Sequence, residues 1–137
     1  GGEEATPHTV RSITSESGKT IWRRPEEKAK RIFHQDHISD INSMLRDVVR
    51  FGTGKRAANG LSKEIAVAGK TGTGDGFVDA WFIGYTSDLV IGVWIGNDKP
   101  LTMEGVYGGT GPARIFNDIL RKLTDYTDIT SGMGTLP

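Results

Sequence analysis

Three apolar runs in the second half of the chain constrain the fold more than any other feature of the sequence. They read "EIAVAGKTGT", "VDAWFIGYT" and "LVIGVWIGN", and only "SD" separates the last two. Connections this short suit antiparallel neighbours, because parallel strands need a long crossover between them. The runs therefore predict an antiparallel meander with strands at 65–73, 79–86 and 89–96.

Two shorter runs and two helical patterns complete the predicted architecture. Residues 9–13 and 19–23 flank the turn-rich "SESG" and predict a hairpin, which we expect to join the same sheet. Apolar residues recur at steps of three and four from Ile38 to Gly52, and again over 111–124, as in amphipathic helices. The prediction is an α+β fold with one antiparallel, five-stranded sheet flanked by helices.

Length and charge fit one modest domain and indicate no charged partner. The chain has 137 residues, and its 17 basic and 17 acidic residues cancel to a formal net charge of zero. Balanced charge provides no electrostatic attraction to nucleic acid or to an anionic membrane. The patterned sequence covers residues 1–124, and residues 125–137 carry no periodicity and are expected to form a loose tail.

No residue pattern predicts a cofactor or a metal ion. Cysteine is absent, which excludes disulfides, thiolate metal ligands and a cysteine nucleophile. The three histidines, His8, His34 and His37, lack the spacing of a metal site.

The lysine of "AVAGKTGTGD" is compatible with two different chemistries. A phosphate-binding P-loop requires G-x-x-x-x-G-K-[ST], and Gly69, Lys70 and Thr71 supply only its end. Glu64 occupies the position of the first glycine, where a carboxylate would repel phosphate, and "GTGDG" does not continue into the helix that such a loop needs. The alternative is K-T-G-T, which extends the K-T-G motif of penicillin-recognising transpeptidases and β-lactamases.

The surrounding sequence resembles the transpeptidase domain of class A penicillin-binding proteins over residues 1–124. Ordered matches carry the resemblance: "GGEEATPHTVRSI", "MLRDVVRFGTGKRA", "AGKTGT", "DAWFIGYTSDLVIGVWIGND" and "GGTGPARIF". The resemblance implies a D,D-transpeptidase that cross-links peptidoglycan through a serine acyl-enzyme and binds D-alanyl stem peptides and β-lactams. It also implies a parent protein that is anchored in the cytoplasmic membrane and works in the periplasm.

The resemblance assigns roles to the residues of the K-T-G-T strand. Lys70 would place a positive charge beside the hydroxyl network of the nucleophile. Thr71 and Thr73, which share a face of an extended strand, would bind the substrate carboxylate, and the Thr73 N–H would be one of two oxyanion-hole donors. Gly72 would allow close packing behind the strand.

Packing roles are predicted for other residues near this strand. Trp81 and Phe82 are consecutive in a strand, so they should lie on opposite faces of the sheet. The glycines of 52–54 are expected to let a loop approach the site.

Two motifs of the family do not occur in the chain. No serine is followed by lysine at the third position, as S-x-x-K requires, and no Ser-x-Asn is present. Because both motifs precede the matched segments in the family, we expect the chain to be the C-terminal part of a transpeptidase domain. Such a chain would be inactive alone and would need the N-terminal half of its own domain as a partner. A non-catalytic module that binds D-alanyl peptides or β-lactams is the alternative, and a nucleotide-binding domain is a third possibility.

Overall fold

The computed structural model describes residues 1–125. Its described residues form two compact units, 1–38 and 39–125, and the boundary falls within helix α1 (Gln35–Arg50). Most of the predicted tail, 126–137, lies outside the described residues.

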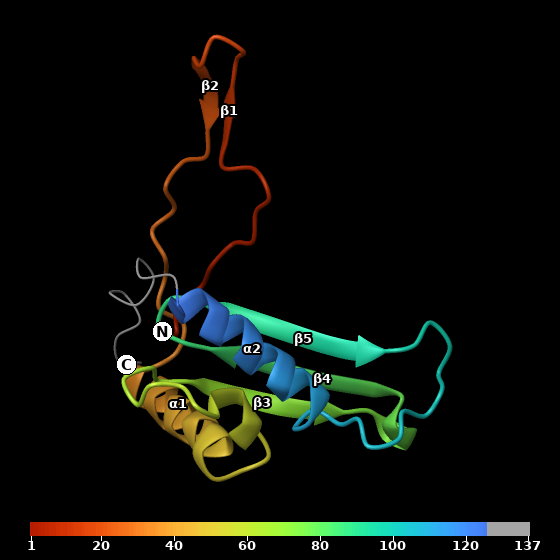
Figure 1. The fold of residues 1–137 in the computed structure, drawn as a ribbon. Coiled ribbons are helices and arrows are strands. Elements are labelled where there is room, and N and C mark those ends of the chain that lie inside the picture. The colour runs from red at the N-terminus through yellow and green to blue at the C-terminus, as the bar shows by residue number, and fades with distance from the viewer. Residues whose placement is uncertain (126–137) are drawn as a thin grey trace. The chain divides into compact units, whose positions relative to one another are not determined.

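The first unit contains a two-stranded hairpin of its own. Strands β1 (Ser12–Thr14) and β2 (Thr20–Arg23) pair antiparallel, with Ile13 opposite Trp22. Figure 1 shows the two strands side by side at the tip of two extended segments. The hairpin prediction is confirmed, but the prediction that it joins one five-stranded sheet is wrong, because the strands belong to two separate sheets. Every residue of β1 and β2 is exposed, so the hairpin has no buried face with which to extend a larger sheet.

The second unit contains the predicted meander. Strands β3 (Ala68–Thr73), β4 (Asp79–Tyr85) and β5 (Val90–Gly96) form an antiparallel sheet in that order, which leaves β3 at one edge. β3 begins later than the predicted residue 65, because the Ile65 N–H bonds the Ser62 carbonyl in a turn. A short 3₁₀ turn, η2 (Asp75–Phe77), connects β3 to β4.

One face of this sheet forms the core together with α2 (Gly111–Asp125), whose predicted position is confirmed (Figure 1). The rings of Phe82 and Phe116 meet edge to face at 5.0 Å, and both side chains are fully buried. Burial of each such ring stabilises the fold by about 1.5–3 kcal/mol. The buried cluster comprises Val49, Ala57, Val67, Phe82, Val93, Ala113, Phe116 and Leu120.

Helix α1 contributes to the second unit through its C-terminal half. Val49 joins the core, and the Tyr85 hydroxyl donates a hydrogen bond to the Asn42 Oδ1 at 2.6 Å. The helix begins at Gln35, before the predicted Ile38, and the Asp36 N–H bonds the Nδ1 of His34 at 3.4 Å. Histidine is not among the preferred N-cap residues, so sequence propensity did not indicate this start.

The opposite face of the sheet is apolar and exposed. Trp81 and Trp94 retain 44% and 48% of their accessible surface, and Ile83 and Val90 are exposed beside them. Trp81 and Phe82 therefore lie on opposite faces, as predicted. Within residues 1–125, no helix has the length and apolar character required to span a bilayer.

Candidate functional site

In the described residues, no other strand pairs with the outer edge of β3 at the K-T-G-T sequence. β3 pairs with β4 on one side only, and the Gly74 N–H donates to the Asp79 carbonyl at 2.8 Å. In an antiparallel ladder, hydrogen-bonded and non-hydrogen-bonded residue pairs alternate, so this bond shows which pairs along β3 and β4 are the hydrogen-bonded ones. Gly72 thus bonds to β4, whereas Thr71 and Thr73 direct their N–H and C=O groups toward the outer edge.

The Lys70 ammonium lies at the same edge. Its Nζ donates to the Thr71 carbonyl at 2.9 Å, and this carbonyl faces outward because of the alternation. The side chain is exposed and makes no ion pair within the described part of the chain. An ammonium group has three donors, so two remain for a ligand. The edge therefore combines a positive charge with the outward N–H of Thr73, an arrangement that favours an anionic ligand or a developing oxyanion.

Two loops engage the two threonine hydroxyls. The Oγ1 atoms of Thr71 and Thr53 are 2.7 Å apart, which joins the loop after α1 to β3. The Thr73 Oγ1 accepts a hydrogen bond from the Gly108 N–H at 3.1 Å, which joins the loop before α2 to the same strand. Because Thr73 accepts in this bond, its own hydroxyl hydrogen is available to a carboxylate.

Glycine allows the loop before α2 to approach this closely. A Cβ on Gly108 would lie 2.6 Å from the Gly72 carbonyl oxygen and even nearer to the Trp81 carbonyl oxygen. A Cβ on Gly72 would meet the Cβ of Trp81, its partner on β4, at 3.3 Å, and the role of Gly72 at the site stays a prediction. The missing side chain of Gly108 thus lets the loop backbone lie against the β3–β4 ladder.

The structure brings Lys70, Thr71 and Thr73 together at one end of β3, while their catalytic and substrate-binding roles stay predictions. Sequence reasoning assigned no site contact to Gly108, which positions Thr73, and foresaw only that the loop of Thr53 would approach the site. Thr53 and Gly108 both lie in glycine-rich stretches, and this high glycine content was the sequence feature that indicated a close approach of loop backbone to the site.

Among residues 1–125, no group of three His, Asp or Glu side chains is placed to hold a metal ion.

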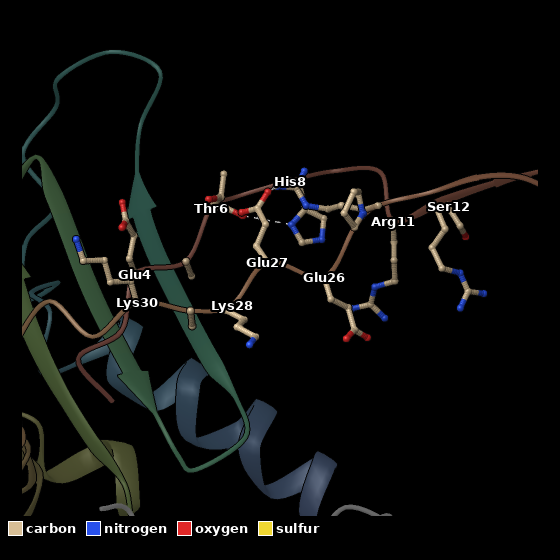
Figure 2. Close-up of a pocket in the computed structure, with 14 residues that line it drawn as sticks. Glu4, Thr6, His8, Arg11, Ser12, Glu26, Glu27, Lys28 and Lys30 are labelled. Atoms are coloured by element: carbon tan, nitrogen blue, oxygen red, sulfur yellow. Dashed lines mark hydrogen bonds and ion pairs between the residues drawn. The ribbon is translucent and has the colours of Figure 1, made fainter.

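A hollow of about 630 Å³ in the first unit is a less convincing site. It opens between the segments 4–12 and 23–30, and Figure 2 shows that the labelled side chains come from both of them. Basic and acidic side chains are mixed there, and Arg24 is paired with Glu27 at 2.9 Å. Residues 4–11 and 24–30 are in neither helix nor strand, so no rigid element orients these groups toward a ligand.

The model of the penicillin-binding protein transpeptidase domain matches residues 1–121 of the chain. The chain belongs to this family. The resemblance of the sequence to a penicillin-binding protein transpeptidase is thereby confirmed. Penicillin-binding protein 1A of Neisseria meningitidis is 46% identical over 126 residues, which cover 88% of the present chain and 16% of that protein. The chain thus spans about a sixth of the length of the curated relatives that it matches.

Solved penicillin-binding protein structures share the fold. The crystal structure of penicillin-binding protein 1A from Haemophilus influenzae aligns with a TM-score of 0.78 at 19% identity, over 92% of this chain and 24% of that one. The D,D-transpeptidase domain of a peptidoglycan glycosyltransferase from Eggerthella lenta aligns with a TM-score of 0.61 at 26% identity, over 88% of this chain and 28% of that one. The predicted α+β class, with antiparallel strands and flanking helices, is confirmed.

Proposed function

We propose that this chain forms the K-T-G-T wall of a D,D-transpeptidase active site that cross-links peptidoglycan stem peptides and binds penicillin. The observation that supports the proposal best is that the Lys70 ammonium donates to the outward carbonyl of Thr71 at the free edge of β3, where the Thr73 N–H also faces outward. A D-alanyl terminus carries a carboxylate beside the carbonyl to be attacked, and these groups provide a partner for each.

In the proposed reaction, a serine oxygen attacks the penultimate carbonyl of the stem peptide. The Thr73 N–H stabilises the oxyanion that forms, and the charge of Lys70 lowers the energy of the developing negative charge. The peptide C–N bond then breaks, D-alanine leaves with a proton, and an acyl-serine ester remains. The amine of a second stem peptide attacks this ester, forms the cross-link and releases the serine.

The serine must come from a segment outside these 137 residues, because the chain contains neither S-x-x-K nor Ser-x-Asn. We propose that the segment is the N-terminal half of the same transpeptidase domain, in a membrane-anchored parent whose catalytic part is periplasmic. The exposed apolar face around Trp81 and Trp94 offers a surface that such a segment would cover. The absence of both motifs also keeps a second candidate open, a module that binds D-alanyl peptides or β-lactams without acylation.

Labelling with a fluorescent penicillin tests the proposal. The purified chain alone should give no labelled band on a denaturing gel. Co-expression with the preceding segment of its reading frame should give a labelled band, and a Ser→Ala variant of the S-x-x-K motif in that segment should abolish it. A labelled band from the chain alone would refute the proposal that the nucleophilic serine lies outside these 137 residues. Non-covalent penicillin binding by the chain alone, with no labelling of the co-expressed pair, would favour the non-catalytic module.

A further inference from the structure

A second concave site lies between helix α2 and the short 3₁₀ helix η1 (Lys55–Ala58), and Lys70 does not line it. The cavity has a volume of about 330 Å³. This volume is at the small end of the range for ligand pockets, about 300–1,000 Å³. Its walls are formed by Arg56, Asn59, Arg114, Asn117, Asp118 and Arg121.

Helix periodicity explains why α2 presents three of these side chains together. Arg114, Asp118 and Arg121 are separated by four and three residues, so they line one side of the helix. The buried residues Ala113, Phe116 and Leu120 occupy the side that packs on the core.

A buried amide fixes the opposite wall of the pocket. The side chain of Asn117, which is only 5% exposed, donates hydrogen bonds to the carbonyls of Ala57 and Asn59, both at 3.1 Å. These bonds join η1 to α2 and set the position of Arg56, whose Nη1 also donates to the Gly109 carbonyl at 3.2 Å. The pocket is therefore built on hydrogen-bonded elements.

The charges of the pocket are unbalanced. Three guanidinium groups face one carboxylate, and no ion pair joins Asp118 to any of them in residues 1–125. Arginine stays protonated at all ordinary pH values, so the lining keeps its excess of positive charge. This charge attracts an anion, and each guanidinium presents a planar set of donors that matches two oxygens of a carboxylate or phosphate.

We propose that the pocket lined by Arg56, Arg114 and Arg121 is a binding site for a small oxyanion, carried by a phosphate-bearing or carboxylate-bearing ligand. The site is separate from the K-T-G-T edge and does not depend on the function proposed above. Arg56 links the two places, because it also holds the loop that contains Gly108 and Gly109.

The test is an NMR titration of the purified 137-residue chain with sodium phosphate and, in a second arm, with sodium succinate. Sodium chloride keeps the ionic strength constant. The Nε–Hε signals of the arginines and the Nδ2 signals of Asn117 should shift saturably with at least one anion. Saturation with phosphate alone would indicate a phosphate-bearing ligand, and saturation with succinate alone would indicate a carboxylate-bearing one.

Matched variants separate a site from general charge attraction. The double variant Arg114→Gln/Arg121→Gln should weaken binding about tenfold or more, because two charge-assisted donors are lost. Lys122→Gln removes one positive charge from the same helix outside the pocket and should leave binding nearly unchanged. Absence of saturation with both anions, or equal weakening by Lys122→Gln, would overturn the proposal. If circular dichroism shows that the double variant does not fold, Arg121→Lys replaces it, and undiminished binding by this variant would count against the guanidinium site.

Discussion

The side-chain hydroxyls of Thr53 and Thr71 lie 2.7 Å apart, although 18 positions separate the two residues in the sequence. Thr53 belongs to the glycine-rich loop after α1, and Thr71 belongs to the edge strand β3. The loop therefore restrains the rotamer of a threonine that we expect to face the substrate.

A double-mutant cycle should detect coupling between the two hydroxyls. We expect Thr53→Ala and Thr71→Ala each to lower the free energy of unfolding, and the double variant to lose less than the sum. The coupling energy should be about 0.5–1 kcal/mol, because an exposed hydrogen bond contributes at the low end of the usual range. Urea unfolding of the four proteins measures it. Strictly additive effects would show that the short distance contributes nothing to stability.

Substitution of Gly108 should be far more harmful than substitution of Gly92. A Cβ at Gly108 would collide with the backbone of Gly72 and Trp81, whereas a Cβ at Gly92 would have its nearest neighbour at 3.9 Å. We expect Gly108→Ala to cost about 3 kcal/mol or more through overpacking. Gly92→Ala should be neutral, or should stabilise by about 0.5–1 kcal/mol through the smaller entropy of its unfolded chain. Thermal unfolding compares the two, and equal losses would contradict the predicted contact.

The pH dependence of stability should contain a contribution from Tyr85. Burial raises the pKa of Tyr85 above its ordinary value of 10.0. The unfolded chain thus loses this proton at a lower pH than the folded chain does, so the contribution is fully present below pH 10.0 and is lost as the pH rises through the folded pKa.

Comparison with Tyr85→Phe isolates that contribution. At neutral pH, the variant should be less stable by about 1 kcal/mol, because it lacks the hydrogen bond to Asn42. The difference should shrink as the pH rises above 10.0. Urea unfolding over this pH range measures both curves, and a constant difference would show that Tyr85 does not titrate as its burial predicts.

Activity should depend strongly on Lys70. In the co-expressed pair described above, Lys70→Ala should slow acylation by fluorescent penicillin about 10²-fold, the order of magnitude for loss of one preorganised electrostatic group. Lys122→Ala, which removes an exposed lysine from α2, is the control and should acylate at the wild-type rate. An unchanged rate for Lys70→Ala would remove this lysine from the proposed mechanism.

Periodicity made the elements of the second unit predictable. The two apolar runs joined by "SD" located β4 and β5 within one residue at each end, and the three-and-four spacing located α2. The partition into two sheets was not predictable in this way. The strands β1 and β2 form their hydrogen bonds with each other. The sequence pattern of a hairpin does not predict whether it will also pair with an edge strand of another sheet.

Only those site residues that lie together in one short stretch of the sequence could be predicted. Lys70, Thr71 and Thr73 lie within four consecutive positions, so the motif alone located them. The contact with Thr53 and the approach of Gly108 depend on how loops fold over the ladder. Likewise, the spacing of Arg114 and Arg121 can be read from the sequence, but the proximity of Arg56 requires the packing of η1 on α2.

The ring centroids of Trp81 and Trp94 lie 6.3 Å apart on the exposed face of the sheet, and Trp22, in the other unit, is the third tryptophan of the chain. The unmodified protein therefore carries its own optical probe at the surface that we expect a partner to cover. Indole fluorescence shifts to shorter wavelength when water is excluded from the ring. In a Trp22→Phe background, all of the tryptophan emission would come from Trp81 and Trp94. The wavelength of the emission maximum would then report whether that face is exposed to water or covered by a partner, with no attached dye.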